Sequence, residues 1–333
     1  KDWGVYVTDE DGLNRGKWTH YKTIAKADLF SWATGDGAYA GQVVTDDNGT
    51  PNDTSDDWFY YYVPVKDKAS EAAGQDPFAI GVAKSKSPLG PWKAIGKPLL
   101  TTSQTRIETI DPAFFVDEDG TGYLHFGTFG TQLAIKMKKD ATTGRTSYTE
   151  TETKADGTTP NLHTMKDADN NANGPKGFFE AAWVFRKGDT YYNVYDGGKP
   201  GSGTATCVES NYQACIQYST SDSPLGPWKY QGVIVPSGSA TTMHPSVLQF
   251  GDKWYVTYHT GDKEGGTDFR RAVCIDEVDW TADGQMTSTA HPTKAEKTQP
   301  STNVAPYAKV SATFTETPAY KGSVNDGRVL QTI

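Results

Sequence analysis

Residues 87–92 are Ser-Pro-Leu-Gly-Pro-Trp, and the same six residues recur at 223–228, 136 positions further along the chain. Each copy follows a short apolar stretch that we predict to be a strand, 79–83 in one case and 214–218 in the other. Trp18, 74 positions before Trp92, ends a similar segment near the N-terminus. A repeat of this length indicates that one structural unit recurs along the chain.

A second series of repeats has the same period. Four predicted strands open on an aromatic residue, at steps of 65, 68 and 63: Trp58, Tyr123, Tyr191 and Trp254. A unit of about 65 residues with three or four short strands is typical of one blade of a β-propeller. Blades stack around an axis because a single small sheet cannot bury both of its faces alone.

We therefore predict an all-β fold, a five-bladed β-propeller over residues 1–300. Four complete units span about 36–300, and Gly4–Thr8 is a strand of a first blade that is incomplete in this chain. The 34 glycines, 18 prolines and 12% aromatic content favour many short strands joined by turns. A two-sheet sandwich does not predict a regular period.

Composition also limits the partners. The net charge is −9 and no basic face is evident, which argues against binding to nucleic acid. No apolar run approaches the roughly 20 residues of a membrane-spanning helix. Cys207 and Cys215 are eight apart and could form one disulfide or stay as two thiols, and no cysteine spacing indicates zinc. The oligomeric state cannot be predicted.

Three ionisable residues occupy equivalent positions in successive units. Asp111, Glu180 and His244 lie 12, 11 and 10 residues before the aromatic residues that open the next strands. We predict that each begins the innermost strand of its blade, at 111–116, 180–185 and 244–248. Innermost strands face the axis, so these three side chains are expected to converge there.

Taken singly, each residue has an ordinary explanation. Asp111 before a proline could cap a turn, and His244 could be a satisfied core histidine. Glu180 inside an apolar strand is harder to explain, because a buried carboxylate is costly unless it is paired or functional. The common position favours a functional site for the two acids and leaves His244 open. Two carboxylates at one pocket suit glycoside hydrolysis, with aromatic rings offering faces for sugars.

Several segments resemble glycoside hydrolase family 43, in matching order and over about residues 1–290: Ile110–Gly120, Phe179–Phe185, His244–Val247, Ala40–Val43 and Arg270–Asp276. The resemblance implies a five-bladed propeller and an inverting mechanism. It implies that Glu180 is the general acid. It also implies that Asp111 is the carboxylate that tunes the pKa of that acid and orients the substrate.

The resemblance implies further contacts with the substrate: Tyr39, which stands where many relatives have tryptophan, Gln42, Phe115, His244, and one of Arg270 and Arg271. Strand alternation lets only one of the two arginines face the axis. His244 would lie on the axis, where family members often hold water, a halide or a structural calcium ion that it would contact through water. No cofactor is expected to be required.

The general base is the main departure from the family pattern. The family places it on the innermost strand of the first blade, and in this chain that position is expected to lie upstream of Lys1. Asp2, Asp9 and Asp11 fall on or after the third strand of that blade, so we assign the base to none of them. Either the chain is N-terminally truncated or the protein cannot complete hydrolysis.

The predicted function is an inverting exo-glycosidase that releases terminal α-L-arabinofuranose from the side chains of plant cell-wall polysaccharides, at an extracellular or cell-surface location. The alternatives are a β-xylosidase of the same family and a non-catalytic glycan-binding propeller. Fructan-cleaving relatives have Arg-Asp-Pro and Glu-Cys where this chain has Ile110-Asp111 and Glu180-Ala181. Residues 301–333, where the period ends, are a linker or the start of a carbohydrate-binding module.

Overall fold

The computed structural model describes residues 2–9, 17–35, 37–197, 207, 214–236, 241–261, 266–267 and 269–288. The predicted linker or module at 301–333 lies outside the described residues. Within them the chain forms antiparallel sheets and three short helices: α2 (Lys26–Leu29), α3 (Lys68–Ala72) and α4 (Thr102–Thr105). No helix among the described residues is long and apolar enough to cross a membrane.

The described strands form five sheets. The first pairs β1 (Trp3–Val7) with β2 (Thr19–Ile24). The second has the order β3 (Gln42–Asp46), β4 (Trp58–Lys66), β5 (Phe78–Ser85), β6 (Lys93–Ala94), and β7 (Leu100–Thr101) pairs with β5. The third has the order β8 (Ala113–Val116), β9 (Gly122–Phe126), β10 (Leu133–Lys139), β11 (Thr146–Thr151), and β12 (Leu162–Thr164) pairs with β10.

The last two sheets have four strands each, in simple sequence order. The fourth sheet consists of β13 (Phe178–Lys187), β14 (Thr190–Gly197), β15 (Cys215–Ser221) and β16 (Lys229–Val235). The fifth consists of β17 (Ser246–Phe250), β18 (Lys253–Thr260), β19 (Ala272–Trp280) and β20 (Met286–Ser288). The four predicted aromatic strands are β4, β9, β14 and β18, the second strand of each of the last four sheets.

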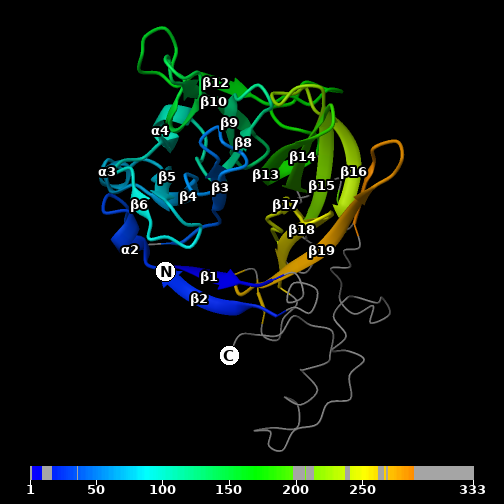
Figure 1. The fold of residues 1–333 in the computed structure, drawn as a ribbon. Helices are drawn as coiled ribbons and strands as arrows, with labels where there is room; N and C mark the ends of the chain where they lie inside the picture. The colour runs from blue at the N-terminus through cyan, green and yellow to red at the C-terminus, as the bar shows by residue number, and fades with distance from the viewer. Residues whose placement is uncertain are drawn as a thin grey trace, which may run out of the picture.

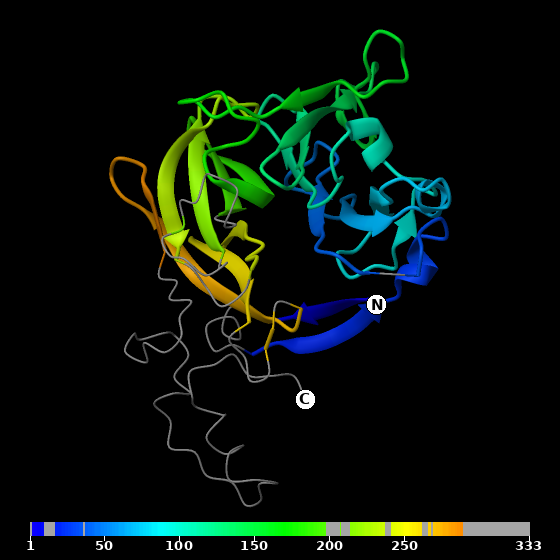
Figure 2. The ribbon, with the colours of Figure 1, turned by 180° about the vertical axis from the view of Figure 1, so that it is seen from behind.

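The sheets are arranged around a central axis as in a β-propeller (Figure 1, Figure 2). Around that axis β8 lies next to β3 and to β13, and β13 lies next to β17, so the first strands of these sheets are innermost. The two-stranded sheet of β1 and β2 lies between the second and the fifth sheets. The predicted all-β propeller is confirmed, and the number of five blades stays a prediction.

The repeated hexapeptide forms the same turn in both sheets. In each copy the glycine N–H donates to the carbonyl oxygen of the first serine, at 2.9 Å for Gly90 and 3.0 Å for Gly226. Both glycines have a positive φ, and a Cβ on either would lie 2.8 Å from a tryptophan ring atom. The hexapeptide therefore recurs because, in both sheets, the turn after the third strand packs the tryptophan ring against the glycine.

The hydrophobic core lies between neighbouring sheets and is rich in aromatic rings. Tyr62 of β4 stacks on Phe114 of β8 with ring centroids 5.0 Å apart, which joins the second sheet to the third. Phe185 of β13 contacts Trp254 of β18 at 5.4 Å, which joins the fourth to the fifth. Large aromatic side chains bury much apolar area and so fix the sheets relative to one another. That packing holds the ends of the innermost strands at the axis.

Candidate active site

Asp111 lies at the axial end of the third sheet, two residues before β8. The sequence-based prediction started this strand at Asp111 itself. The structure starts it at Ala113, because Pro112 has no N–H to donate to a strand partner. Asp111 has a left-handed φ of 56°, and it is 5% exposed. The Ala181 N–H donates to its carboxylate, but burial, reinforced by Glu108, raises the pKa of Asp111 to about 7.

Glu180 lies in β13, where the pairing with β14 shifts register on both sides of it. The next residue, Ala181, has a φ of 58°, so the backbone turns at the acid and aims its side chain differently from a regular strand. The Thr128 hydroxyl donates to Oε2 of Glu180 at 2.9 Å. Burial and then the nearby Asp111 raise the pKa of Glu180 to about 7. A carboxyl group with this pKa can carry a proton in neutral solution.

Asp196 is a third buried acid beside Asp111 and Glu180, and it was not predicted from the sequence. We call these three residues the carboxyl cluster. It is the register partner of Glu180 on β14 and is fully buried. The Met243 N–H donates to its Oδ2 at 3.1 Å, and Oδ1 has no hydrogen-bond partner among the described residues. Burial, followed by the charge of Glu180, raises the pKa of Asp196 well above its usual range. The available sequence signal was an aspartate at the end of an aromatic strand, opposite Glu180.

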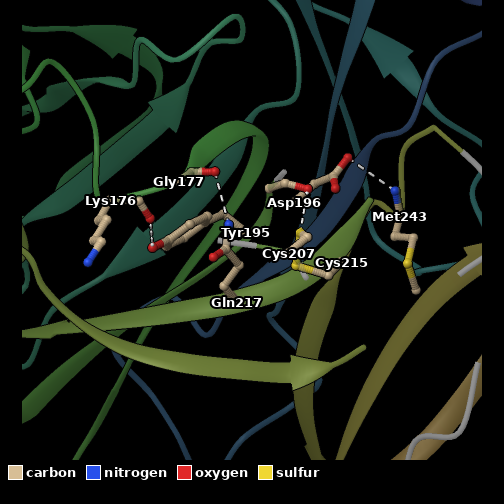
Figure 3. Close-up of a disulfide and its surroundings, with 9 residues drawn as sticks. Lys176, Gly177, Tyr195, Asp196, Cys207, Cys215, Gln217 and Met243 are labelled. Carbon is tan, nitrogen blue, oxygen red and sulfur yellow. Dashed lines mark hydrogen bonds between the residues drawn. A yellow bond between two sulfur atoms is a disulfide. The ribbon is translucent and has the colours of Figure 1, made fainter. Parts of the chain in front are cut away.

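A disulfide lies beside Asp196, between Cys207 and Cys215 (Figure 3). The sequence left open whether these two cysteines pair, and the structure pairs them. Cys215 begins β15 and is the register partner of Gly197, the residue after Asp196. The Cys207 sulfur lies 3.0 Å from the Gly197 carbonyl oxygen. The disulfide therefore fastens residue 207 to the strand end that carries the buried acid.

Two histidines and one arginine complete the cluster. Nδ1 of His244 lies 3.7 Å from Oδ1 of Asp111, and burial lowers the pKa of His244 to about 4, so it is neutral at pH 7. Nε2 of His259 accepts from the His244 N–H at 3.3 Å and from Arg271 at 3.1 Å. The positive charge of Arg271 opposes the rise in pKa of Asp111 and Glu180. Arg270 instead forms a backbone turn with Thr267 and is exposed.

Three other residues that were predicted to contact the substrate make contacts within the protein. The Gln42 side chain accepts from the Phe114 N–H and donates to its carbonyl oxygen at 3.1 Å, which braces β3 against β8. The Phe115 ring lies 6.3 Å and 6.1 Å from the rings of Tyr123 and Tyr191. The Tyr39 ring lies 5.0 Å from that of Phe78. A contact of these residues with substrate stays a prediction.

The axial ion expected at His244 also stays a prediction. In the part of the chain that the structure describes, no three His, Cys, Asp or Glu side chains are grouped so that they could hold a metal ion. The described residues therefore do not fit a directly coordinated cation. We derive no chemical step through a metal.

The chain is similar to known enzymes along most of its length. The model of glycosyl hydrolases family 43 matches residues 14–286. A xylosidase/arabinosidase of Bacteroides ovatus is 27% identical over 304 residues, which cover 86% of this chain and 82% of the relative. An arabinoxylan arabinofuranohydrolase of Bacillus subtilis is 30% identical over 259 residues, which cover 74% of this chain and 47% of the relative.

Solved structures agree with the fold. A β-xylosidase/α-arabinofuranosidase from a compost metagenome, in complex with xylotriose and in a calcium-free form, superposes with a TM-score of 0.59 at 26% identity, covering 82% of this chain and 79% of that one. A family 43 enzyme of Xanthomonas citri with xylotriose has a TM-score of 0.64 at 22% identity, covering 90% and 84%. Because the family model matches most of the chain, the chain belongs to glycosyl hydrolases family 43.

Proposed function

We propose that this glycoside hydrolase releases terminal α-L-arabinofuranose from the xylose backbone of arabinoxylan, as an inverting exo-acting enzyme. The arabinoxylan arabinofuranohydrolase of Bacillus subtilis and the xylosidase/arabinosidase of Bacteroides ovatus support the sugar class. The carboxyl cluster at the axial ends of β8 and β13 supports the chemistry, because glycoside hydrolysis needs an acid with a raised pKa to protonate the leaving oxygen.

Glu180 is the proposed general acid, and the raised pKa of its carboxyl group carries the proposal. Burial and Asp111 raise this pKa to about 7, so a large fraction of the group carries a proton in neutral solution and can donate it to the glycosidic oxygen. Thr128 donates to Oε2 and so fixes the orientation of the carboxyl group. Oε1 is then the oxygen that can face the leaving group.

Asp111 is the proposed orienting residue. Its carboxyl group is buried in the same cluster as Glu180, where it can accept a hydrogen bond from a sugar hydroxyl group. Its contact with His244 and the Ala181 N–H hold it in place. It also raises the pKa of Glu180. The same group therefore binds the sugar and keeps the acid protonated.

We assign the general base to none of the described residues. Asp2 is engaged elsewhere, because its Oδ1 accepts from the Lys26 N–H at 3.1 Å. In an inverting enzyme the base and the acid stand roughly 6.5–9.5 Å apart, which leaves room for the attacking water.

A β-xylosidase is the second candidate. A β-xylosidase of Xylanibacter ruminicola is 28% identical over 226 residues, and the compost-metagenome structure carries both activity names. We also propose an extracellular or cell-surface location. The disulfide supports it, since disulfides persist in oxidising environments, and so does a polymeric substrate.

The deciding experiment compares release of nitrophenol from p-nitrophenyl α-L-arabinofuranoside and from the β-D-xyloside. We expect the arabinofuranoside to be cleaved faster, with NMR showing an inverted anomer as first product. Glu180→Gln should reduce cleavage of arabinoxylan oligosaccharides by about 10²–10⁴-fold and affect the nitrophenyl substrate less, because nitrophenolate leaves without a proton. Unchanged cleavage of the oligosaccharides would contradict the role of Glu180. Faster cleavage of the xyloside would favour the second candidate.

A further inference from the structure

The loop between β9 and β10 contains a strained aromatic residue. The Thr131 N–H donates to the Thr128 carbonyl oxygen at 3.1 Å, which closes a four-residue turn. The two central residues, Phe129 and Gly130, have φ values of 51° and 82°, as in a type I′ turn. Such turns prefer Asn-Gly, and a bulky aromatic residue with positive φ is an outlier that its surroundings must enforce.

This turn is anchored to both segments that carry the acids. The Gly127 N–H donates at 3.0 Å to the carbonyl oxygen of Ile110, the residue before Asp111. The Gly130 N–H donates at 3.3 Å to the carbonyl oxygen of Phe179, the residue before Glu180. Thr128 itself holds the Glu180 carboxyl group. The position of Phe129 is therefore fixed relative to the catalytic groups.

The Phe129 side chain is largely exposed, although its backbone is strained. It is 64% exposed, whereas Phe179 beneath it is 8% exposed. The two rings meet edge to face, with centroids 5.6 Å apart and planes at 76°. Single exposed apolar side chains are common on proteins, but they rarely combine with a strained backbone and anchoring on both sides. A ligand that packs on the ring would explain all three features.

We propose that the Phe129 ring is a stacking surface for the sugar on the leaving-group side of the scissile bond, a xylose of the polysaccharide backbone. This inference rests on the proposed function, in which Glu180 protonates the oxygen between the two sugars. The terminal sugar fills the buried side of that oxygen, near Asp111. The next sugar then lies on the exposed side, beside Thr128 and Phe129, where its apolar C–H face can pack on the ring.

The test measures binding in a Glu180→Gln background, so that turnover does not interfere. The ligands are an arabinose-substituted xylotriose and free L-arabinose, titrated by ligand-observed NMR. Phe129→Asn places the favoured residue in the type I′ turn, so its melting temperature should be equal or higher. Phe129→Tyr keeps an aromatic ring. Phe250→Asn, at the opposite end of β17 from His244 and 41% exposed, is the matched control.

We expect Phe129→Asn to weaken the oligosaccharide about tenfold and to leave L-arabinose unchanged, with Phe129→Tyr close to the parent. An unchanged oligosaccharide affinity in Phe129→Asn would overturn the inference. So would an equal loss for both ligands, which would place the ring at the terminal sugar. The proposed function fails by a separate result, namely no cleavage of either nitrophenyl sugar by the chain with Glu180 intact.

Discussion

The Thr128 hydroxyl group reaches from the loop after β9 to the next sheet and donates to Oε2 of Glu180 at 2.9 Å. A hydrogen bond of this kind stabilises the ionised carboxylate and so lowers the pKa of Glu180, while burial and Asp111 raise it. The pKa of the proposed acid is thus set by contributions from two sheets. Removing the hydrogen bond from Thr128 tests this balance.

Thr128→Val should raise the pKa of Glu180. Valine has a similar shape but cannot donate, and a hydrogen bond to a charged group is worth about 1.5–3 kcal/mol. The alkaline limb of the pH profile of kcat/KM should therefore move up by about one pH unit. Thr128→Ser keeps the hydroxyl and should stay near the parent profile. A valine variant with an unshifted limb would show that the hydrogen bond does not govern the acid.

Asp196→Asn should make the protein more stable in alkaline solution. The folded-state pKa of Asp196 is raised, so its contribution to stability is complete below the unfolded pKa of about 3.9 and is lost as the pH rises toward the folded value. Asparagine does not ionise and can still accept from the Met243 N–H. In urea unfolding, the variant should resemble the parent at pH 4 and exceed it by about 1 kcal/mol or more at pH 9.

The exposed Asp189→Asn is the matched control and should change the free energy of unfolding by less than about 0.5 kcal/mol at both pH values. If Asp196→Asn loses stability with rising pH as steeply as the parent, Asp196 is not the source of the alkaline sensitivity.

The propeller could be predicted from the sequence because the features that indicate it recur at a regular interval along the chain. The aromatic strands recur in each of the last four sheets and the hexapeptide recurs in the second and fourth, since equivalent turns need the same residues. Asp111 and Glu180 were found by the same spacing. Asp196 was missed because it belongs to the second strand of its sheet, and its place opposite Glu180 depends on strand register.

The hydrogen-bond partners of the predicted site residues could not be predicted from the sequence, for a related reason. The family resemblance made Gln42 a substrate contact, but the sequence could not show that both ends of its amide bind the Phe114 backbone, 72 residues away. The sequence predicted that either Arg270 or Arg271 faces the axis. Only the fold shows that Arg271 is the one that donates to His259. Such contacts join different sheets, so no local pattern records them.

Removing the disulfide should lower stability. The bond between Cys207 and Cys215 closes a loop with a sequence separation of 8, for which loop entropy predicts a stabilisation of roughly 2–3 kcal/mol. Cys207→Ser with Cys215→Ser should therefore lower the melting temperature by about 3–4 °C. Dithiothreitol should lower the melting temperature of the parent but not that of the double variant. Cys274→Ser, at the cysteine that is outside this disulfide, is the control. Equal melting temperatures in parent and double variant would contradict the expectation.

Gly197→Ala should disturb both the fourth sheet and the acid cluster. An alanine Cβ would lie 1.5 Å from Nε2 of Gln217 and 2.6 Å from the Gly177 carbonyl oxygen. Gln217 cannot swing aside without losing its hydrogen bond to that same oxygen, at 2.9 Å. We expect a loss of about 3 kcal/mol in the free energy of unfolding, as for severe overpacking.

Gly35→Ala is the control for Gly197→Ala, because nothing lies within 4 Å of its Cβ position. Adding Gln217→Ala to Gly197→Ala should recover only part of the loss, since the clash with the Gly177 carbonyl oxygen persists. Because Gly197 directly follows Asp196, the residue opposite Glu180, the single variant should also lower kcat at temperatures where it is still folded. A Gly197→Ala variant as stable as the parent would show that the strand end can shift, and that Asp196 is held less rigidly than its contacts indicate.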